Sequence, residues 1–148
     1  PDFYTVGGMG HASQIALGIS INKKKEVICL DGDGSVLMHM GSLAINASIN
    51  KKNYKHIVFN NGAHESVGNQ PTVGFDIDMS MIAKYSGYSL TLRAHTKTQV
   101  IKAVKKILNH KGTAFLEVLV KSNARSDLSR PDKTPIENKK QLMSLINK

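Results

Sequence analysis

The sequence is poor in the features that mark secreted and membrane-spanning proteins. Its 148 residues include one cysteine, Cys29, so no disulfide can form within the chain. No apolar run approaches the roughly 20 residues that a membrane-spanning helix needs, and the polar, glycine-rich start has no signal-peptide pattern. We therefore expect a cytoplasmic protein without a membrane partner, in which Cys29, set in the apolar run 27–30, is a buried and unreactive thiol.

Aromatic residues are also scarce, with four Phe, four Tyr and no Trp. The formal net charge of +9 suggests an anionic ligand and, taken alone, a nucleic acid. The lysines, however, stand in short clusters scattered along the chain, and the aromatic residues do not alternate with them as a base-stacking surface requires. We expect no nucleic-acid partner, and the charge then favours small anionic molecules.

Apolar runs alternate with amphipathic stretches, without repeats or low-complexity segments. This pattern predicts an α/β domain with a mainly parallel sheet flanked by helices. The expected strands are 27–31, 55–59, 88–92 and 114–120, and the expected helices are 12–21, 36–49, 78–85, 96–109 and one beginning at 134. Two helices begin with capping boxes, at 96–99 and 134–137. We expect one domain over residues 1–148, cut from a longer chain, because Pro1 is not an initiator residue.

Two turns follow neighbouring expected strands, Gly-Asp-Gly-Ser at 32–35 and Asn-Asn-Gly-Ala at 60–63. Either turn alone is an ordinary surface turn. Together they bracket one βαβ unit, whose right-handed crossover brings both strand ends to the same edge of the sheet. Ligands of open α/β sheets bind at this carboxyl edge.

The residue types at this edge indicate a metal-bound diphosphate. Gly32 and Gly34 allow the backbone to approach a ligand closely. Asp33 can face a phosphate only if a metal lies between them, and Mg²⁺ is commonly held by one carboxylate together with phosphates. Asn61 offers an amide oxygen, and we expect the backbone carbonyl of Ala63 to offer another. The chain has no P-loop pattern and no His/Cys cluster with zinc spacing.

The pairing of 32–34 with 60–61 resembles the diphosphate-binding motif of thiamine-diphosphate enzymes. The resemblance implies thiamine diphosphate and Mg²⁺ as cofactors. It implies that the metal is held by Asp33, Asn61 and the Ala63 carbonyl. The expected contacts of the cofactor are Gly7, Gly8, Met9, Gly32, Asp33, Gly34, Ser35, Asn61, Ala63 and His64.

Residues 6–13 are similar to the turn beneath the cofactor in this family. The similarity implies that Met9 wedges the cofactor into its bent shape and that the Gly7 carbonyl accepts a hydrogen bond from the aminopyrimidine. In the family, the glutamate that activates the cofactor comes from a separate pyrimidine-binding domain. We therefore expect that domain as a partner, in a homo-oligomer or a two-chain complex.

Within the superfamily, residues 60–68, 70–72 and the tail 125–139 resemble the phosphonopyruvate decarboxylases. Asn69 and Ser129 depart from that pattern, because the family has glycine at both positions. The resemblance covers nearly the whole chain but about a third of such an enzyme. It implies conversion of phosphonopyruvate to phosphonoacetaldehyde and CO₂.

Several polar side chains stand near these motifs. His64 follows the metal turn, and it is either a substrate or proton-transfer residue or a loop histidine held by the backbone. Arg125 and Arg130 could bind a phosphonate or could simply order the tail. His39 is expected on a helix surface, and His56 shows no constellation with other residues.

Three other interpretations remain open. A sulfopyruvate decarboxylase β subunit carries this domain as a separate chain and would take a sulfonate in place of a phosphonate. A non-catalytic module could use Mg²⁺ to hold another diphosphate, although the turn at 8–10 is a poor dinucleotide fingerprint. A nucleic-acid binder would show steeply salt-dependent affinity for DNA or RNA.

Overall fold

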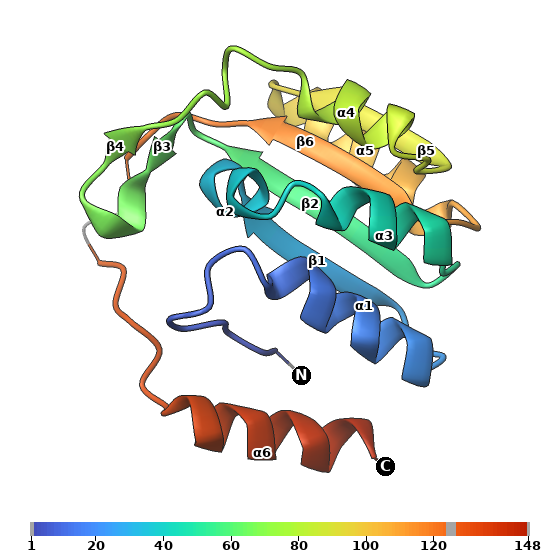
Figure 1. Ribbon diagram of the computed structural model, residues 1–148, viewed down its shortest axis with the longest axis vertical. Coiled ribbons are helices and arrows are strands. Elements are labelled where there is room, and N and C mark those ends of the chain that lie inside the picture. Colours follow the sequence, from blue (N-terminus) through green and yellow to red (C-terminus); the bar gives the residue numbers. More distant parts are fainter. Residues whose placement is uncertain (1, 124–126, 148) are drawn as a thin grey trace.

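The structure is a computed structural model that describes residues 2–123 and 127–147. Four parallel strands form its main sheet, in the spatial order β1-β2-β6-β5 (Figure 1). Their bounds are β1 (Val27–Gly32), β2 (Tyr54–Asn60), β5 (Leu90–Ala94) and β6 (Ala114–Leu119). The expected α/β class with a mainly parallel sheet is confirmed.

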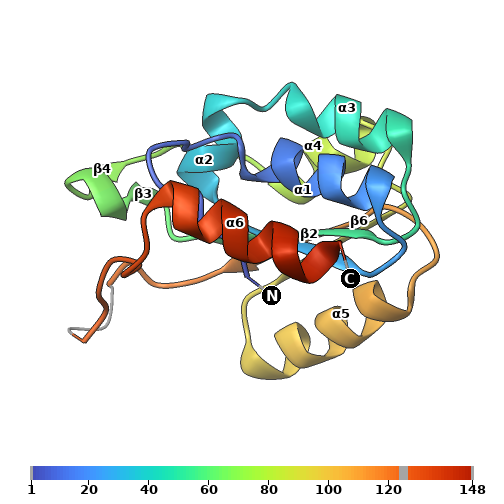
Figure 2. The same cartoon turned by 90° about the horizontal axis from the view of Figure 1, so that it is seen from below.

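Helices cover both faces of this sheet, with α1, α3 and α4 on one side and α5 on the other (Figure 2). The helices are α1 (Ala12–Asn22), α2 (Asp33–Met38), α3 (Ser42–Ile49), α4 (Met79–Tyr85), α5 (Lys97–Asn109) and α6 (Pro135–Ile146). The capping boxes predicted at Thr96 and Thr134 are both formed and begin α5 and α6. None of the helices within the described residues is both long enough and apolar enough to cross a membrane.

The alternation of side chains along the strands builds two cores. Tyr54 and Val58 of β2 point to the side of α1, α3 and α4, and Ile57 points to the side of α5. β1 is an edge strand whose second face stays largely open, with Ile28 46% and Leu30 61% exposed. α6 lies beside the N-terminal segment, where the Asn138 side chain donates a hydrogen bond to the Tyr4 carbonyl.

The single helix expected over 36–49 is wrong, because α2 ends at Met38 and α3 begins at Ser42. The break has a tertiary cause. His39 leaves the helical conformation, with φ −136° and ψ 49°, and its ring packs against Gly10 and lies 4.5 Å from the ring of His11. Apolar periodicity cannot show such a contact.

The strand expected from Tyr88 begins two residues later, at Leu90. Tyr88 still belongs to the turn after α4, since its N–H donates to the Ala83 carbonyl and Gly87 has a positive φ of 106°. A small hairpin was not expected at all. It consists of β3 (Ala63–His64), a 3₁₀ turn, η1 (Glu65–Val67), and β4 (Gln70–Pro71), and it stands at the carboxyl end of the main sheet beside α2 (Figure 1).

Candidate metal and diphosphate site

The first predicted turn lies where β1 passes into α2. Gly32 ends the strand and Asp33 begins the helix, with 1% of Asp33 exposed. The two oxygens of this carboxylate have different partners. Oδ2 accepts a hydrogen bond from the Thr72 hydroxyl, and Oδ1 faces the Asn61 backbone N–H at 3.4 Å. The two predicted turns therefore meet at one place, as the parallel pairing of β1 with β2 requires.

The second turn holds its two asparagines in different ways. The side chain of Asn60 is fully buried, and its amide nitrogen donates to the Gly74 carbonyl at 2.6 Å and to Glu117 Oε1 at 2.8 Å. Asn61 is only half-buried, and its amide nitrogen donates to Glu65 Oε2 at 2.8 Å. The Asn61 Oδ1 atom accepts the Ala63 N–H at 3.1 Å and keeps a second lone pair for a ligand.

Glu117 of β6 holds this turn by accepting the hydrogen bond from the Asn60 side chain. It is fully buried, accepts a hydrogen bond from the Ser80 N–H at 3.3 Å and forms an ion pair with Arg93 Nε at 3.2 Å. Burial raises the pKa of Glu117 above its usual value, while the Asn60 amide and the Arg93 guanidinium act in the opposite direction. Sequence reasoning assigned Glu117 no role, because nothing in a strand pattern shows which side chain of the next strand it meets.

The glycine-rich turn at 7–10 lies against the start of α2. Gly7 and Gly10 have φ values of 75° and 87°, a region that favours glycine. The Gly10 N–H donates to the Ser35 hydroxyl at 3.0 Å, which ties this turn to the Gly-Asp-Gly turn. Gly7, Gly8, Met9 and Ser35 line an open groove of about 1410 Å³ between α1, β1 and α6.

The candidate substrate residues lie nearby. The ring of His64 fits over Gly34 so closely that a Cβ on Gly34 would overlap it. Arg130 lines the same groove and donates from Nη2 to the Ser66 carbonyl at 3.3 Å. Arg125 lies outside the described residues. The structure therefore brings His64 to the Gly-Asp-Gly turn and Arg130 to the groove, while their roles stay predictions.

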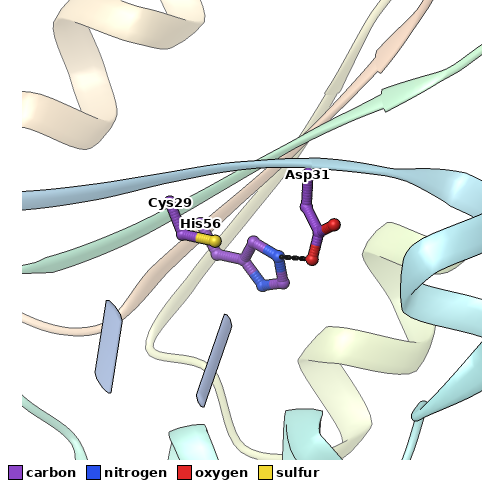
Figure 3. Close-up of side chains that lie close together, drawn as sticks. All are labelled: Cys29, Asp31 and His56. Carbon is purple, nitrogen blue, oxygen red and sulfur yellow. Dashed lines mark hydrogen bonds and ion pairs between the residues drawn. The ribbon is translucent and has the colours of Figure 1, made fainter. Parts of the chain in front are cut away.

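A third group of polar side chains lies beneath the first turn, where Cys29, Asp31 and His56 converge (Figure 3). The expectation that His56 forms no constellation is wrong, because parallel register places it opposite Cys29. One ligand atom of each residue lies within 4.8 Å of the others, a spacing that a metal ion could bridge.

Hydrogen bonds already engage Asp31 and His56 of this group. His56 Nε2 meets Asp31 Oδ2 and His56 Nδ1 meets the Tyr88 hydroxyl, both at 3.3 Å. Asp31 Oδ1 accepts the Gly32 N–H at 3.0 Å. Burial raises the pKa of the Cys29 thiol, as expected of an unreactive cysteine. We read the cluster as a support for the strand end that carries Gly32.

The donors at the meeting point of the two turns suit Mg²⁺. A buried carboxylate, an amide oxygen and a backbone carbonyl are hard oxygen ligands, which this ion prefers. The carboxylate of Asp33 is buried without a Lys or Arg partner in the described residues, and a buried anion needs such compensation. Asp33, Asn61 and the Ala63 carbonyl thus fit the proposed metal chemically.

Fold and site together define a class, a parallel α/β domain with two polar, glycine-containing turns at the carboxyl edge of its sheet. The chain belongs to the family described as Thiamine pyrophosphate enzyme, C-terminal TPP binding domain, which it matches over residues 2–118.

Its relatives include decarboxylases of two kinds. A phosphonopyruvate decarboxylase of Streptomyces viridochromogenes is 31% identical over 144 residues, which are 97% of this chain and 36% of that protein. A sulfopyruvate decarboxylase subunit beta of Methanococcus maripaludis is 32% identical over 147 residues, 99% of this chain and 78% of that subunit. The corresponding subunit of Methanocaldococcus jannaschii is 40% identical over 109 residues, 73% of this chain and 57% of that subunit.

The chain spans about a third of the length of the phosphonopyruvate decarboxylases that it matches. Among solved structures, a thiamine diphosphate-dependent 4-hydroxybenzoylformate decarboxylase of Rhodococcus jostii RHA1 shares the fold. The TM-score is 0.66 at 22% identity, over 79% of this chain and 24% of that one. The chain thus corresponds to the thiamine-pyrophosphate-binding domain or subunit of a decarboxylase family.

Proposed function

We propose that this chain binds Mg²⁺ and the diphosphate of thiamine diphosphate, and so supplies half of the active site of a 2-oxo acid decarboxylase. The observation that carries the proposal is the meeting of Asp33 with the Asn61 turn, where Asp33 Oδ1 lies 3.4 Å from the Asn61 N–H. Asp33, Asn61 and the Ala63 carbonyl would hold the metal. When bound, thiamine diphosphate supplies the electron sink for the decarboxylation.

The remaining residues of the site bind and orient. Gly7 and Met9 line the groove, and in our proposal the Met9 side chain and the Gly7 carbonyl would support the cofactor. The hydrogen bond between Gly10 and Ser35 keeps their turn in register with the metal turns. His64, whose ring packs on Gly34, would contact the diphosphate side of the site or move a proton at its ring nitrogens.

Phosphonopyruvate is the substrate that we propose, since relatives of that name match along 97% and 91% of this chain. The bond between the carboxylate and the carbonyl carbon breaks, CO₂ leaves, and a proton replaces it on that carbon to give phosphonoacetaldehyde. Arg130, which lines the groove, would meet the phosphonate with its guanidinium.

A sulfopyruvate decarboxylase β subunit is the second candidate. It is favoured by one observation, that a sulfopyruvate decarboxylase subunit beta is 40% identical to this chain over 109 residues, whereas the phosphonopyruvate decarboxylase is 31% identical over 144 residues. The sulfonate is also a tetrahedral anion, so the same arginine would serve it.

The activating glutamate would come from a partner pyrimidine-binding domain or subunit. All four glutamates of this chain have other contacts. The pairs are Glu26 with Lys55, Glu65 with Asn61, Glu117 with Asn60 and Glu137 with Thr134. These contacts support the view that the site is completed from outside the chain.

The test is a calorimetric titration with thiamine diphosphate, with and without Mg²⁺, on the protein in its natural length and assembly. We expect binding that needs Mg²⁺ and is lost in Asp33→Ala, whereas the exposed Asp76→Asn control binds like the wild type. CO₂ release from phosphonopyruvate and from sulfopyruvate then separates the two substrates. Mg²⁺-independent binding, or a preference for ADP, would favour a non-catalytic diphosphate-binding module instead.

A further inference from the structure

The hairpin after the metal turn brings Thr72 over Asp33. Thr72 directly follows β4, and three hydrogen bonds hold it. Its backbone N–H donates to the Gly62 carbonyl at 2.8 Å, and its hydroxyl oxygen accepts the Gly74 N–H at 3.0 Å. The Thr72 hydroxyl donates a hydrogen bond to Asp33 Oδ2. Thr72 thus connects the metal turn at 60–63 with the carboxylate of the other turn.

Because of this contact, the two carboxylate oxygens of Asp33 have different hydrogen-bond partners. Oδ2 of Asp33 accepts a hydrogen bond from the Thr72 hydroxyl, whereas among residues 2–123 and 127–147 Oδ1 has only the long contact of 3.4 Å to the Asn61 N–H. Resting on the function proposed above, we propose that Thr72 is a positioning residue of the metal site. It holds Oδ2 so that Oδ1 stays directed at the metal.

Gly74 packs closely around this hydrogen bond. A Cβ on Gly74 would lie 2.6 Å from both Asp33 Oδ2 and Asn60 Oδ1, and 3.0 Å from Thr72 Oγ1. The backbone of Gly74 therefore closes against all three side chains, and only a residue without a side chain fits there. Close packing of this kind is what a defined orientation of a carboxylate requires.

The contact of Thr72 and Gly74 with Asp33 is linked by hydrogen bonds to the centre of the sheet. Asn60 donates to the Gly74 carbonyl on one side and to the buried Glu117 on the other. A continuous path of hydrogen bonds therefore runs from Glu117 through Asn60, Gly74 and Thr72 to Asp33. Outer partners that fix a ligating carboxylate commonly tune metal affinity in this way.

A purely structural role for Thr72 makes a different prediction, and two substitutions separate the roles. Thr72→Val keeps the shape of the side chain but removes the hydroxyl, and Thr72→Ser keeps the hydroxyl but removes the methyl group. Thr72 is half-buried on a hairpin, so we expect both variants to fold. Thr72→Ala, which places no methyl group against the carboxylate, replaces the valine variant if that variant does not fold.

The experiment measures the Mg²⁺ dependence of thiamine diphosphate binding by calorimetry, together with thermal unfolding, on the protein in its natural length and assembly. We expect Thr72→Val to raise the apparent Kd for Mg²⁺ by about ten- to a hundredfold, and Thr72→Ser to stay within about threefold of the wild type. Mn²⁺ binding followed by electron paramagnetic resonance tests the same order of affinities among the variants without turnover.

The outcomes separate this inference from the proposed function. If the wild type shows no Mg²⁺-dependent binding, both are wrong. If the wild type binds and Thr72→Val binds Mg²⁺ equally well, the positioning role alone is wrong, whatever happens to the melting temperature. Equal losses of metal affinity in the valine and serine variants would also overturn it, because the hydroxyl would then not be the active group.

Discussion

Gly10 offers a quantitative test of the turn beneath the proposed cofactor site. Its φ of 87° lies in the left-handed region, where a residue with a side chain is disfavoured by about 1–2 kcal/mol. A Cβ there would also overlap Nδ1 of the His39 ring and lie 3.1 and 3.2 Å from its Cε1 and Cγ atoms. Moving that ring off its rotamer costs about 0.5–1.5 kcal/mol. We expect Gly10→Ala to lower the free energy of unfolding by about 1.5–3.5 kcal/mol.

The two contributions can be separated in a double-mutant cycle with His39→Ala. Without the ring, Gly10→Ala should cost only the backbone term of about 1–2 kcal/mol. Gly18→Ala is the matched control, because Gly18 lies within α1 and a Cβ there meets nothing within 4 Å. That change should stabilise the protein by about 0.5–1 kcal/mol.

Thermal unfolding followed by circular dichroism measures the effects. For a domain of 148 residues, a loss of about 1.5–3.5 kcal/mol lowers the melting temperature by about 3–14 °C. Equal costs of Gly10→Ala with and without His39 would refute the clash. An unchanged melting temperature in both backgrounds would refute the left-handed turn itself.

Three further predictions concern buried polar groups. Burial raises the pKa of Tyr54 and of Tyr88 above the usual value, so above about pH 10 the unfolded chain releases phenolic protons that the folded chain keeps. The free energy of unfolding should therefore fall as the pH rises from 9 to 11, and urea titrations that show a flat profile would contradict this. The Cys29 thiol is 4% exposed and burial raises its pKa. A thiol reagent should therefore modify it in urea but not in the native protein. Rapid modification of the native protein would show that the strand around Cys29 is open to solvent. Lys55 is fully buried and donates to three backbone carbonyls, so Lys55→Met should cost about 2–4 kcal/mol in a denaturation assay, and an unchanged midpoint would mean that these carbonyls find water.

Most helices and strands of the fold could be predicted from local sequence patterns. The capping boxes at Thr96 and Thr134 are written in four consecutive residues each, so their helices could be predicted to within about a residue. The strand Ala114–Leu119 could be predicted equally well, because its run of apolar, β-favouring residues lies between polar segments. The break at His39 could not be read, since it depends on packing against Gly10 from another part of the chain.

The site divides in the same way. The turns that carry Asp33 and Asn61 each follow a strand, and parallel topology alone predicts that they meet. The partners that hold them come from elsewhere. In the sequence, Thr72 stands out only as part of a family resemblance. Glu117 is predicted only to lie within a strand. Their contacts with Asp33 and Asn60 depend on a hairpin and a strand order that no local pattern specifies.

The strand order has a consequence for when the protein becomes competent. β6 is the last strand of the sheet to be synthesised, yet it lies between β2 and β5, and its pairing of Ala114 with Lys55 joins distant parts of the chain. Such non-local pairing is the slow step of sheet formation. Until β6 inserts, Asn60 lacks its acceptor on Glu117. A nascent chain that has exposed both polar turns therefore still lacks the hydrogen bond that ties the second turn to β6, and we expect this turn to become ordered only when the sheet closes.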